Sequence, residues 1–275
     1  MGKKDKIQIA IPCGYNSEKY TKFLIDSIER TSSNEHDIEY LIGVNHAHVD
    51  LNLLASLMKS IELRHDYKII VKEDRYTGNI STGHGQCVDM ITPHMNSKYG
   101  MIVDSDCAFL SKNWDIKFSS LINKEYPIIG TEYGLGDNHY SGNANVIICF
   151  FYTDVMKEIG MSWVPEMKNI TINADNTHIY NRKVGDEIFL DTGSLLPKKL
   201  YENNLKSFYM PLLSPRIAET CHMLKFMTDD MRGDEHQIAG QPICTHLGRS
   251  SSRCFETNPE AQLWKKRVIE WLQKV

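Results

Sequence analysis

The sequence contains Gly100-Met101-Ile102-Val103-Asp104-Ser105-Asp106-Cys107-Ala108-Phe109, a short apolar run that ends at two aspartates one residue apart. Branched apolar residues in such a run predict a buried strand. Successive side chains of a strand point to opposite faces, so Asp104 and Asp106 are expected on the same side. Two carboxylates there repel each other unless a cation lies between them, and Mg²⁺ or Mn²⁺ with a substrate diphosphate fits. The alternative is a surface turn, for which Asp-Ser-Asp is ordinary chemistry.

The composition is that of an ordinary globular protein. Of the 275 residues, 41% are hydrophobic and 24% are charged, which allows a large core without disulfide bonds. The net charge of −4 argues against broad, nonspecific binding of nucleic acid, although not against a local basic groove. Seven scattered cysteines, a start without a signal-peptide pattern and the absence of a long apolar run predict a cytoplasmic protein with no transmembrane segment.

The N-terminal half alternates strand and helix patterns with short connections. Strands are expected over 7–11, 38–44, 67–71 and 101–103, and helices from about 17, over 51–63 and over 83–94. This alternation predicts parallel strands in one sheet with helices on both faces. Ligands of such sheets bind beyond the carboxyl ends of the strands. Polar or small residues occupy all of those ends: Gly14-Tyr15-Asn16, Asn45, Asp74-Arg75 and Asp104-Ser105-Asp106.

The second half is less regular. Strands are expected over 127–131, 145–152 and 243–247, and helices over 153–159, 192–203 and 259–274. Residues 161–185 show no clear period, as expected of a substrate loop or an irregular insertion. The amphipathic terminal helix is expected to pack on the sheet, with peripheral contact to an anionic membrane as the alternative.

Three passages resemble a nucleotide-sugar-dependent glycosyltransferase of the GT-A fold, similar to family 2. The first is Ile9-Ala10-Ile11-Pro12-Cys13-Gly14-Tyr15-Asn16, which is similar to the opening strand and nucleotide loop. The second is His84-Gly85-Gln86-Cys87-Val88-Asp89-Met90-Ile91 with the later Asp104-Ser105-Asp106, which resembles the helix before a metal-binding Asp-x-Asp. The third is Cys244-Thr245-His246-Leu247-Gly248, a late strand that ends in histidine. The Gln/Arg-x-x-Arg-Trp signature of processive synthases is absent.

The resemblance implies an α/β, GT-A (Rossmann-like) fold, with a mostly parallel central sheet and an irregular acceptor-side C-terminal half. Residues 1–275 would form one domain, with about 1–125 binding the nucleotide and about 126–275 the acceptor. The implied cofactor is Mn²⁺ or Mg²⁺. Asp106 would contact the metal directly, Asp104 would contact the ribose or the metal through water, and His246 would be a further ligand. A structural, hydrogen-bonding role is the alternative for His246.

Further residues are candidates for contact with the donor. Backbone amides in the first strand-to-helix turn approach a nucleotide readily, and an aromatic ring there stacks on a base. An acid after the third strand accepts from base or ribose, and an arginine pairs with phosphate. The candidates are Pro12, Gly14, Tyr15, Asn16, Asp74, Arg75, Gly83 and His84. Ordinary turn formation and a solvated ion pair are the alternatives.

A catalytic base is expected in residues 185–193, at the start of a helix. An inverting transfer needs a carboxylate that takes the proton of the acceptor hydroxyl. Asp191 is the first choice and Glu187 the second, with helix N-capping as the alternative role of Asp191. Trp163 is an aromatic candidate for acceptor contact, although an isolated tryptophan is usually core.

The sequence thus predicts a metal-dependent glycosyltransferase of hexosyltransferase type. It would move a sugar from a nucleoside-diphosphate-sugar, with UDP or GDP as the nucleotide, to a hydroxyl of a glycan, a lipid-linked sugar, a protein or modified DNA. A nucleotidyltransferase that makes sugar nucleotides is one alternative. It would need a Gly-rich loop with a basic residue directly after the first strand, and here no Lys or Arg occurs before Lys19. A noncatalytic module that binds sugar nucleotides is the other.

Overall fold

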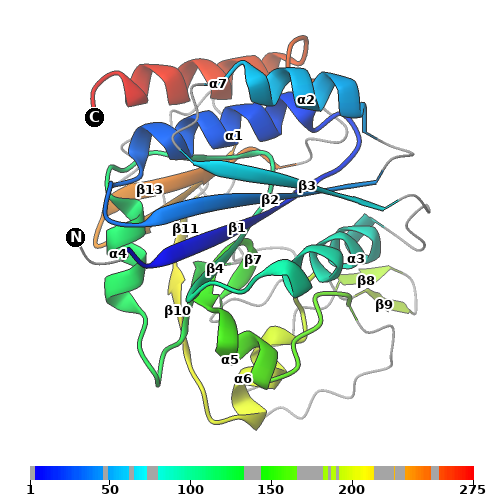
Figure 1. The fold of residues 1–275 in the computed structure, drawn as a ribbon, viewed down its shortest axis with the longest axis vertical. Coiled ribbons are helices and arrows are strands. Elements are labelled where there is room, and N and C mark those ends of the chain that lie inside the picture. Colours follow the sequence, from blue (N-terminus) through cyan, green and yellow to red (C-terminus); the bar gives the residue numbers. More distant parts are fainter. Residues whose placement is uncertain are drawn as a thin grey trace.

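The computed structural model describes most of the chain, and the fold is drawn in Figure 1. The described residues are 4–45, 49–61, 65–72, 80–132, 144–165, 182–184, 187–189, 192–213, 226, 233–248 and 254–275.

A mixed, mostly parallel sheet forms the centre of the molecule. Its strand order is β10-β6-β7-β4-β1-β2-β3, and β7 alone runs antiparallel to its neighbours. The strands are β1 (Lys6–Cys13), β2 (Asp37–Asn45), β3 (Asp66–Lys72), β4 (Tyr99–Val103), β6 (Ile128–Thr131), β7 (Asn145–Tyr152) and β10 (Ser207–Met210). The parallel set β4-β1-β2-β3 confirms the predicted order of strands and helices in the first half.

Helices cover both faces of this sheet (Figure 1). The helices are α1 (Glu18–Thr31), α2 (Leu51–Lys59), α3 (Ile80–Ile91) with the short 3₁₀ helix Thr92–His94, α4 (Trp114–Leu121), α5 (Thr153–Glu158), α6 (Leu196–Glu202) and α7 (Pro259–Leu272). One core lies under α1, α2 and α4, and the other lies under α3, α5 and α6. The amphipathic patterns of the first half therefore reflect two separate apolar cores.

The side chains of β1 show how the sequence makes these two cores. Ile7, Ile9 and Ile11 pack in the core with α1 and α2, whereas Ala10 faces the core with α3. This division follows from the alternation of side chains along a strand. On the α3 side, a Cβ at Gly43 would lie 2.4 Å from Ile91 Cδ1, so glycine permits the close approach of α3 to β2.

A second, four-stranded sheet joins the main sheet at the end of β4. It has the order β11-β12-β13-β5, and all its pairs are antiparallel. Its strands are β5 (Cys107–Phe109), β11 (Leu212–Leu213), β12 (Asp234–Ile238) and β13 (Gln241–His246). Because β5 follows β4 after three residues, this small sheet brings a late part of the chain beside the predicted aspartates.

The terminal helix packs on the protein, as the favoured interpretation predicted. Trp264 and Val268 are fully buried, and Trp271 Nε1 donates a hydrogen bond to the Leu110 carbonyl at 2.8 Å. Phe23 of α1 lies against Trp264, with ring centroids 5.4 Å apart. The apolar face of α7 is therefore occupied by the fold. No helix of the described ranges has both the length and the apolar character needed to cross a bilayer.

Several short elements differ from the sequence-based expectation. Glu187 lies in β9 (Glu187–Phe189), which pairs with β8 (Arg182–Val184), and not at the start of a helix. The β-branched Ile188 and the aromatic Phe189 favour a strand. The helix expected from 192 begins at Leu196, because residues 192–195 form turns before Pro197 enters the first helical turn. The helix α4 and the strands β5, β8, β9, β10, β11 and β12 were not predicted.

Candidate functional site

Asp104 and Asp106 lie in the turn that connects the two sheets. The Asp104 amide donates to the Ile147 carbonyl at 2.9 Å, and the Cys107 amide donates to the Asp104 carbonyl at 3.1 Å. The aspartates thus follow β4 in a turn, as the alternative interpretation of the sequence has it, but their carboxylates still gather. Backbone hydrogen bonds hold this turn at both ends, and the carboxylates of Asp104 and Asp106 lie at the carboxyl end of the parallel strands.

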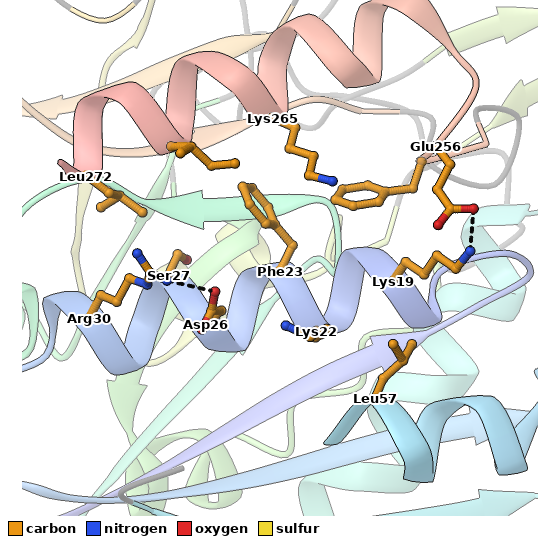
Figure 2. A pocket seen from close by; sticks show the side chains of 12 residues that line it. Lys19, Lys22, Phe23, Asp26, Ser27, Arg30, Leu57, Glu256, Lys265 and Leu272 are labelled. Carbon is orange, nitrogen blue, oxygen red and sulfur yellow. Dashed lines mark ion pairs between the residues drawn. The ribbon is translucent and has the colours of Figure 1, made fainter. Parts of the chain in front are cut away.

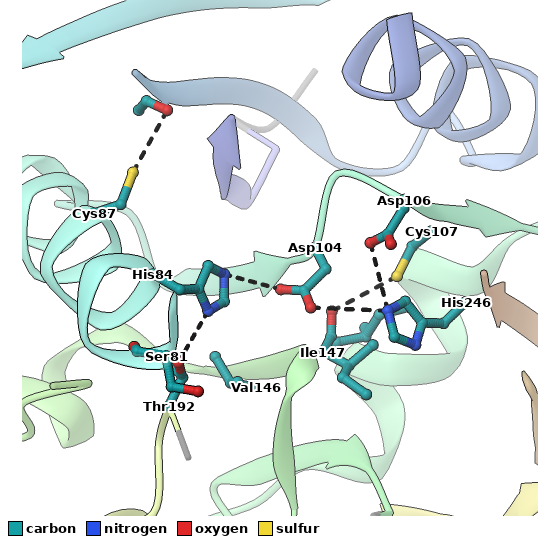
Figure 3. A network of polar contacts seen from close by, with 12 residues as sticks. Ser81, His84, Cys87, Asp104, Asp106, Cys107, Val146, Ile147, Thr192 and His246 are labelled. Carbon is teal, nitrogen blue, oxygen red and sulfur yellow. Dashed lines mark hydrogen bonds and ion pairs between the residues drawn. The ribbon is translucent and has the colours of Figure 1, made fainter. Parts of the chain in front are cut away.

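His246 completes a cluster with these aspartates. It pairs with Cys107 across β13 and β5, and the Leu247 amide donates to the Asp106 carbonyl at 3.0 Å. Its Nε2 lies 3.4 Å from Asp106 Oδ1 and 4.0 Å from Asp104 Oδ2. One ligand atom from each of the three residues lies within 4.8 Å of the others. We call Asp104, Asp106 and His246 the carboxyl-end cluster (Figure 3).

A third carboxylate, which the sequence analysis missed, stands behind His246. Asp234 Oδ2 lies 3.7 Å from His246 Nδ1, and Asp234 is the residue directly opposite His246 in the β12–β13 ladder. In the sequence Asp234 is one acid after Gly233 in a polar stretch. Its place beside His246 cannot be predicted until the pairing of β12 with β13 is known.

The electrostatics of the cluster favour a cation. Burial alone would lower the pKa of the His246 imidazole, but the charges of Asp106 and Asp104, together with polar interactions with Asp106 and Asp234, raise that pKa well above its usual value. The imidazole therefore keeps its proton while no other cation neutralises the carboxylates. A divalent ion that binds here would displace that proton.

The donor atoms suit Mn²⁺ or Mg²⁺. Two carboxylates and one imidazole supply hard oxygen ligands and one nitrogen, and the partial exposure of Asp104 leaves room for water or phosphate oxygens. A structural zinc site would need a different donor set, because structural zinc is held by four Cys and His ligands. The residues present thus fit the metal that the sequence predicted.

His84 lies on the other side of Asp104. Its Nε2 is 3.1 Å from Asp104 Oδ1, and its Nδ1 is 3.1 Å from Thr192 Oγ1 (Figure 3). The Thr192 hydroxyl donates its own hydrogen to the Ser81 carbonyl at 2.8 Å, so Thr192 accepts from a protonated Nδ1. The predicted donor-contacting residue His84 is thereby joined to the cluster and to a residue of the second half.

The first strand-to-helix turn only partly matches the expectation. Gly14, Tyr15 and Asn16 are exposed between β1 and α1, with the Tyr15 ring 59% exposed and Asn16 at φ +58°. The predicted end of the first strand was wrong: Pro12 is buried in β1 opposite Gly43, because the strand continues to Cys13. A contact of Pro12 with the donor stays a prediction.

The remaining predicted residues have different outcomes. Gly83 lies half-buried in α3, next to His84. Asp74, Arg75 and Asp191 lie outside the described residues, as does the side chain of Glu187. The Trp163 side chain is 1% exposed and packs against Phe151, so it belongs to the core and does not line an acceptor surface.

A groove of about 370 Å³ lies between α1 and α7 (Figure 2). It is lined by apolar rings and by basic side chains such as Lys22 and Lys265, and Lys19 pairs with Glu256 at 2.5 Å along it. None of its lining residues was predicted to bind the metal or the nucleotide. The carboxyl-end cluster is thus a separate place on the protein.

Known structures identify the fold. The protein is similar to the mannosyltransferase PcManGT from Pyrobaculum calidifontis, solved in complex with GDP-Man and Mn²⁺, at a TM-score of 0.51 and 8% identity over 76% of this chain and 55% of that one. The chain has a GT-A glycosyltransferase fold. No family model and no curated protein matches its sequence.

Two further similar structures have lower TM-scores. S. aureus TarS 1–349 in complex with UDP-GlcNAc has a TM-score of 0.42 and 14% identity, over 75% of this chain and 58% of that one. Mouse xyloside xylosyltransferase 1 has a TM-score of 0.40 and 9% identity, over 56% of this chain and 69% of that one. The chain spans little more than half the length of the mannosyltransferase and of this TarS fragment.

Proposed function

We propose that this chain is a metal-dependent glycosyltransferase, which moves a sugar from a nucleoside-diphosphate-sugar to an acceptor hydroxyl. The observation that carries the proposal is the carboxyl-end cluster, which lies where open α/β sheets bind ligands. We expect one GT-A domain, with about 1–125 binding the donor and about 126–275 the acceptor.

The residues of the site have distinct roles in this proposal. Asp106 and His246 hold Mn²⁺ or Mg²⁺, and Asp104 contacts the ion through water or binds the ribose. An ion held by these residues would supply positive charge that neutralises the diphosphate leaving group. His84, held by Thr192, faces the diphosphate or the donor sugar. Tyr15 stacks on the base, and the backbone of the exposed turn approaches the nucleotide.

Asp191 is the proposed catalytic base, with Glu187 as the second choice. Asp191 lies outside the described residues, and what supports its role is its place in the sequence directly before Thr192, whose Oγ1 lies 3.1 Å from His84 Nδ1. Asp191→Asn should retain donor binding and lose transfer, since the amide cannot take a proton. An N-cap role predicts little change, because Asn caps as well as Asp. Full transfer by Asp191→Asn with inactive Glu187→Gln would move the base to Glu187.

The donor is expected to be a UDP- or GDP-sugar. The mannosyltransferase of similar fold was solved with GDP-Man and Mn²⁺, which makes GDP-mannose the first donor to test. The acceptor is a glycan, a lipid-linked sugar, a protein or modified DNA.

The central experiment measures release of nucleoside diphosphate from a panel of UDP- and GDP-sugars, with Mn²⁺ and with a chelator. We expect slow, Mn²⁺-dependent release from one donor by the wild type, and none by Asp106→Ala. Asp154→Ala, which removes an exposed acid on α5, is the matched control and should behave as the wild type. Release of pyrophosphate from a sugar phosphate and a nucleoside triphosphate would instead indicate a nucleotidyltransferase. Binding without turnover of any donor would indicate a noncatalytic module.

A further inference from the structure

We propose that Asp234 is a positioning residue that orients His246 for the metal. Its carboxylate would hold Nδ1 of the ring, which leaves Nε2 turned toward Asp104 and Asp106. The inference rests on the proposed metal site, and it adds a residue that none of the sequence motifs contains.

The backbone places these two residues face to face. Asp234 and His246 are direct partners in the antiparallel β12–β13 pair, in which opposite Cβ atoms lie about 4.5–5.5 Å apart. Thr245 Oγ1 donates to the Asp234 carbonyl at 2.7 Å, and Trp264 Nε1 donates to Thr245 Oγ1 at 3.1 Å. The strand that carries Asp234 is therefore tied to β13 and to the terminal helix.

The His246 ring lies opposite Asp234 and is also confined by its surroundings. Gly248 lies next to the ring: a Cβ there would be 3.4 Å from His246 Cε1, in van der Waals contact, and the φ of +72° at that position favours glycine. The His246 side chain is 13% exposed and that of Asp234 is 10% exposed. A ring in such a confined place has few orientations, and the side of the ring with Nδ1 faces Asp234.

The chemistry of imidazole makes this orientation useful. A neutral histidine carries one N–H and one lone pair, and a hydrogen bond from one nitrogen fixes the lone pair on the other. The Nδ1–Oδ2 distance of 3.7 Å is that of an ion pair, and a small shift would make it a hydrogen bond. The Nε2 lone pair would then face the carboxylates at 3.4 and 4.0 Å, where the ion would bind. Metal-binding histidines usually have such a partner.

Asp234 acts through His246 in this proposal and not as a ligand. The described acidic and histidine groups that gather within 4.8 Å are Asp104, Asp106 and His246, without Asp234. This distinction gives the proposal a sharp test, because a residue that acts through His246 has no effect on the metal once His246 is removed.

The test measures binding of Mn²⁺ alone to the full chain, from the loss of the free-Mn²⁺ electron paramagnetic resonance signal. We expect Asp234→Ala to weaken binding at least about tenfold. Asp234→Asn should lose less, because its amide oxygen still accepts from Nδ1. In the His246→Ala background, Asp234→Ala should cause no further loss.

Thr245→Val is the matched control for strand pairing. It removes the hydrogen bond to the Asp234 carbonyl but keeps the carboxylate, so it should lower the melting temperature and leave Mn²⁺ affinity within about twofold. Wild-type affinity in Asp234→Ala would overturn the inference and leave the metal site standing. An equal loss with and without His246 would also overturn it and would make Asp234 a direct ligand. A wild-type chain that binds no Mn²⁺ would overturn the proposed metal site itself.

Discussion

Two clusters of aspartate and histidine lie at opposite ends of the parallel strands, and they differ in the number of carboxylates around each histidine. The first, here called the amino-end cluster, consists of Ser33, His36 and Asp115, next to the start of β2. The fully buried Asp115 accepts bonds from the Ser33 amide at 2.8 Å, from Ser33 Oγ at 2.5 Å and from His36 Nδ1 at 2.9 Å. These bonds lower the pKa of Asp115 although burial would raise it.

The carboxyl-end cluster has the opposite balance. Asp104, Asp106 and Asp234 surround His246 at distances of 3.4 to 4.0 Å, which are longer than hydrogen bonds in good geometry. In the amino-end cluster one carboxylate accepts three short bonds, whereas three carboxylates lie around His246, and His84 Nε2 is 3.1 Å from one of them, Asp104. The comparison shows that the ratio of acids to donors, and not the residue types, separates a structural cluster from a candidate metal site.

The largest expected effect comes from removing one aspartate from each cluster. Asp115→Ala should lower the free energy of unfolding by about 3 kcal/mol, because it leaves the buried Ser33 amide and the His36 ring without their acceptor. Asp106→Ala in metal-free protein should change it less, because the substitution relieves repulsion between carboxylates while it removes the attraction between Asp106 and His246. Urea unfolding in the presence of a chelator measures both. A loss of similar size in Asp106→Ala would mean that its carboxylate is also structural.

A third histidine, His236, should make the free energy of unfolding depend on pH. His236 is fully buried on β12, and burial lowers its pKa to about 4, against the opposing charge of Asp234 and with a contribution from His246. In the unfolded chain His236 takes up a proton near pH 6.5, whereas in the folded protein it stays neutral until about pH 4. Its contribution to the free energy of unfolding is therefore fully present above pH 6.5 and is lost as the pH falls toward 4. This residue should contribute a loss of about 2 kcal/mol between pH 7.5 and pH 5. Unfolding of the wild type and His236→Gln at both pH values checks this. An identical pH dependence of the two proteins would contradict it.

The smallest expected effect comes from replacing the histidine of each cluster, His246 and His36. His246→Ala should weaken Mn²⁺ binding at least about tenfold, which is about 1.4 kcal/mol, with little change in melting temperature. His36→Ala should lower the melting temperature, because it removes the bond from His36 to Asp115. It should leave the Mn²⁺ affinity unchanged, because His36 lies at the other end of the sheet from the carboxyl-end cluster. Titration calorimetry with Mn²⁺ and thermal unfolding of both variants separate the roles. A large fall in stability with normal Mn²⁺ affinity would assign His246 a structural role.

The sequence by itself determined the parts of the protein whose physics is local. The apolar run before Asp104 and the alternation of strands and amphipathic helices depend on residues close together in the chain, and they predicted β1 to β4 with their helices. The aspartate pair at the end of β4 followed from the same pattern. Short strands such as β5 and β12 carry too few residues to show a period, and Glu187 was misplaced for that reason.

Only the tertiary structure decided which residues surround those aspartates. His246 reaches Asp106 because β13 pairs with β5 across about 140 residues of sequence, and Asp234 reaches His246 through the β12–β13 ladder. Pairing between strands this far apart depends on the packing of the whole molecule and not on local preference. The resemblance suggested a metal role for His246, but the excess of carboxylates around it became visible only when three separate segments were brought together.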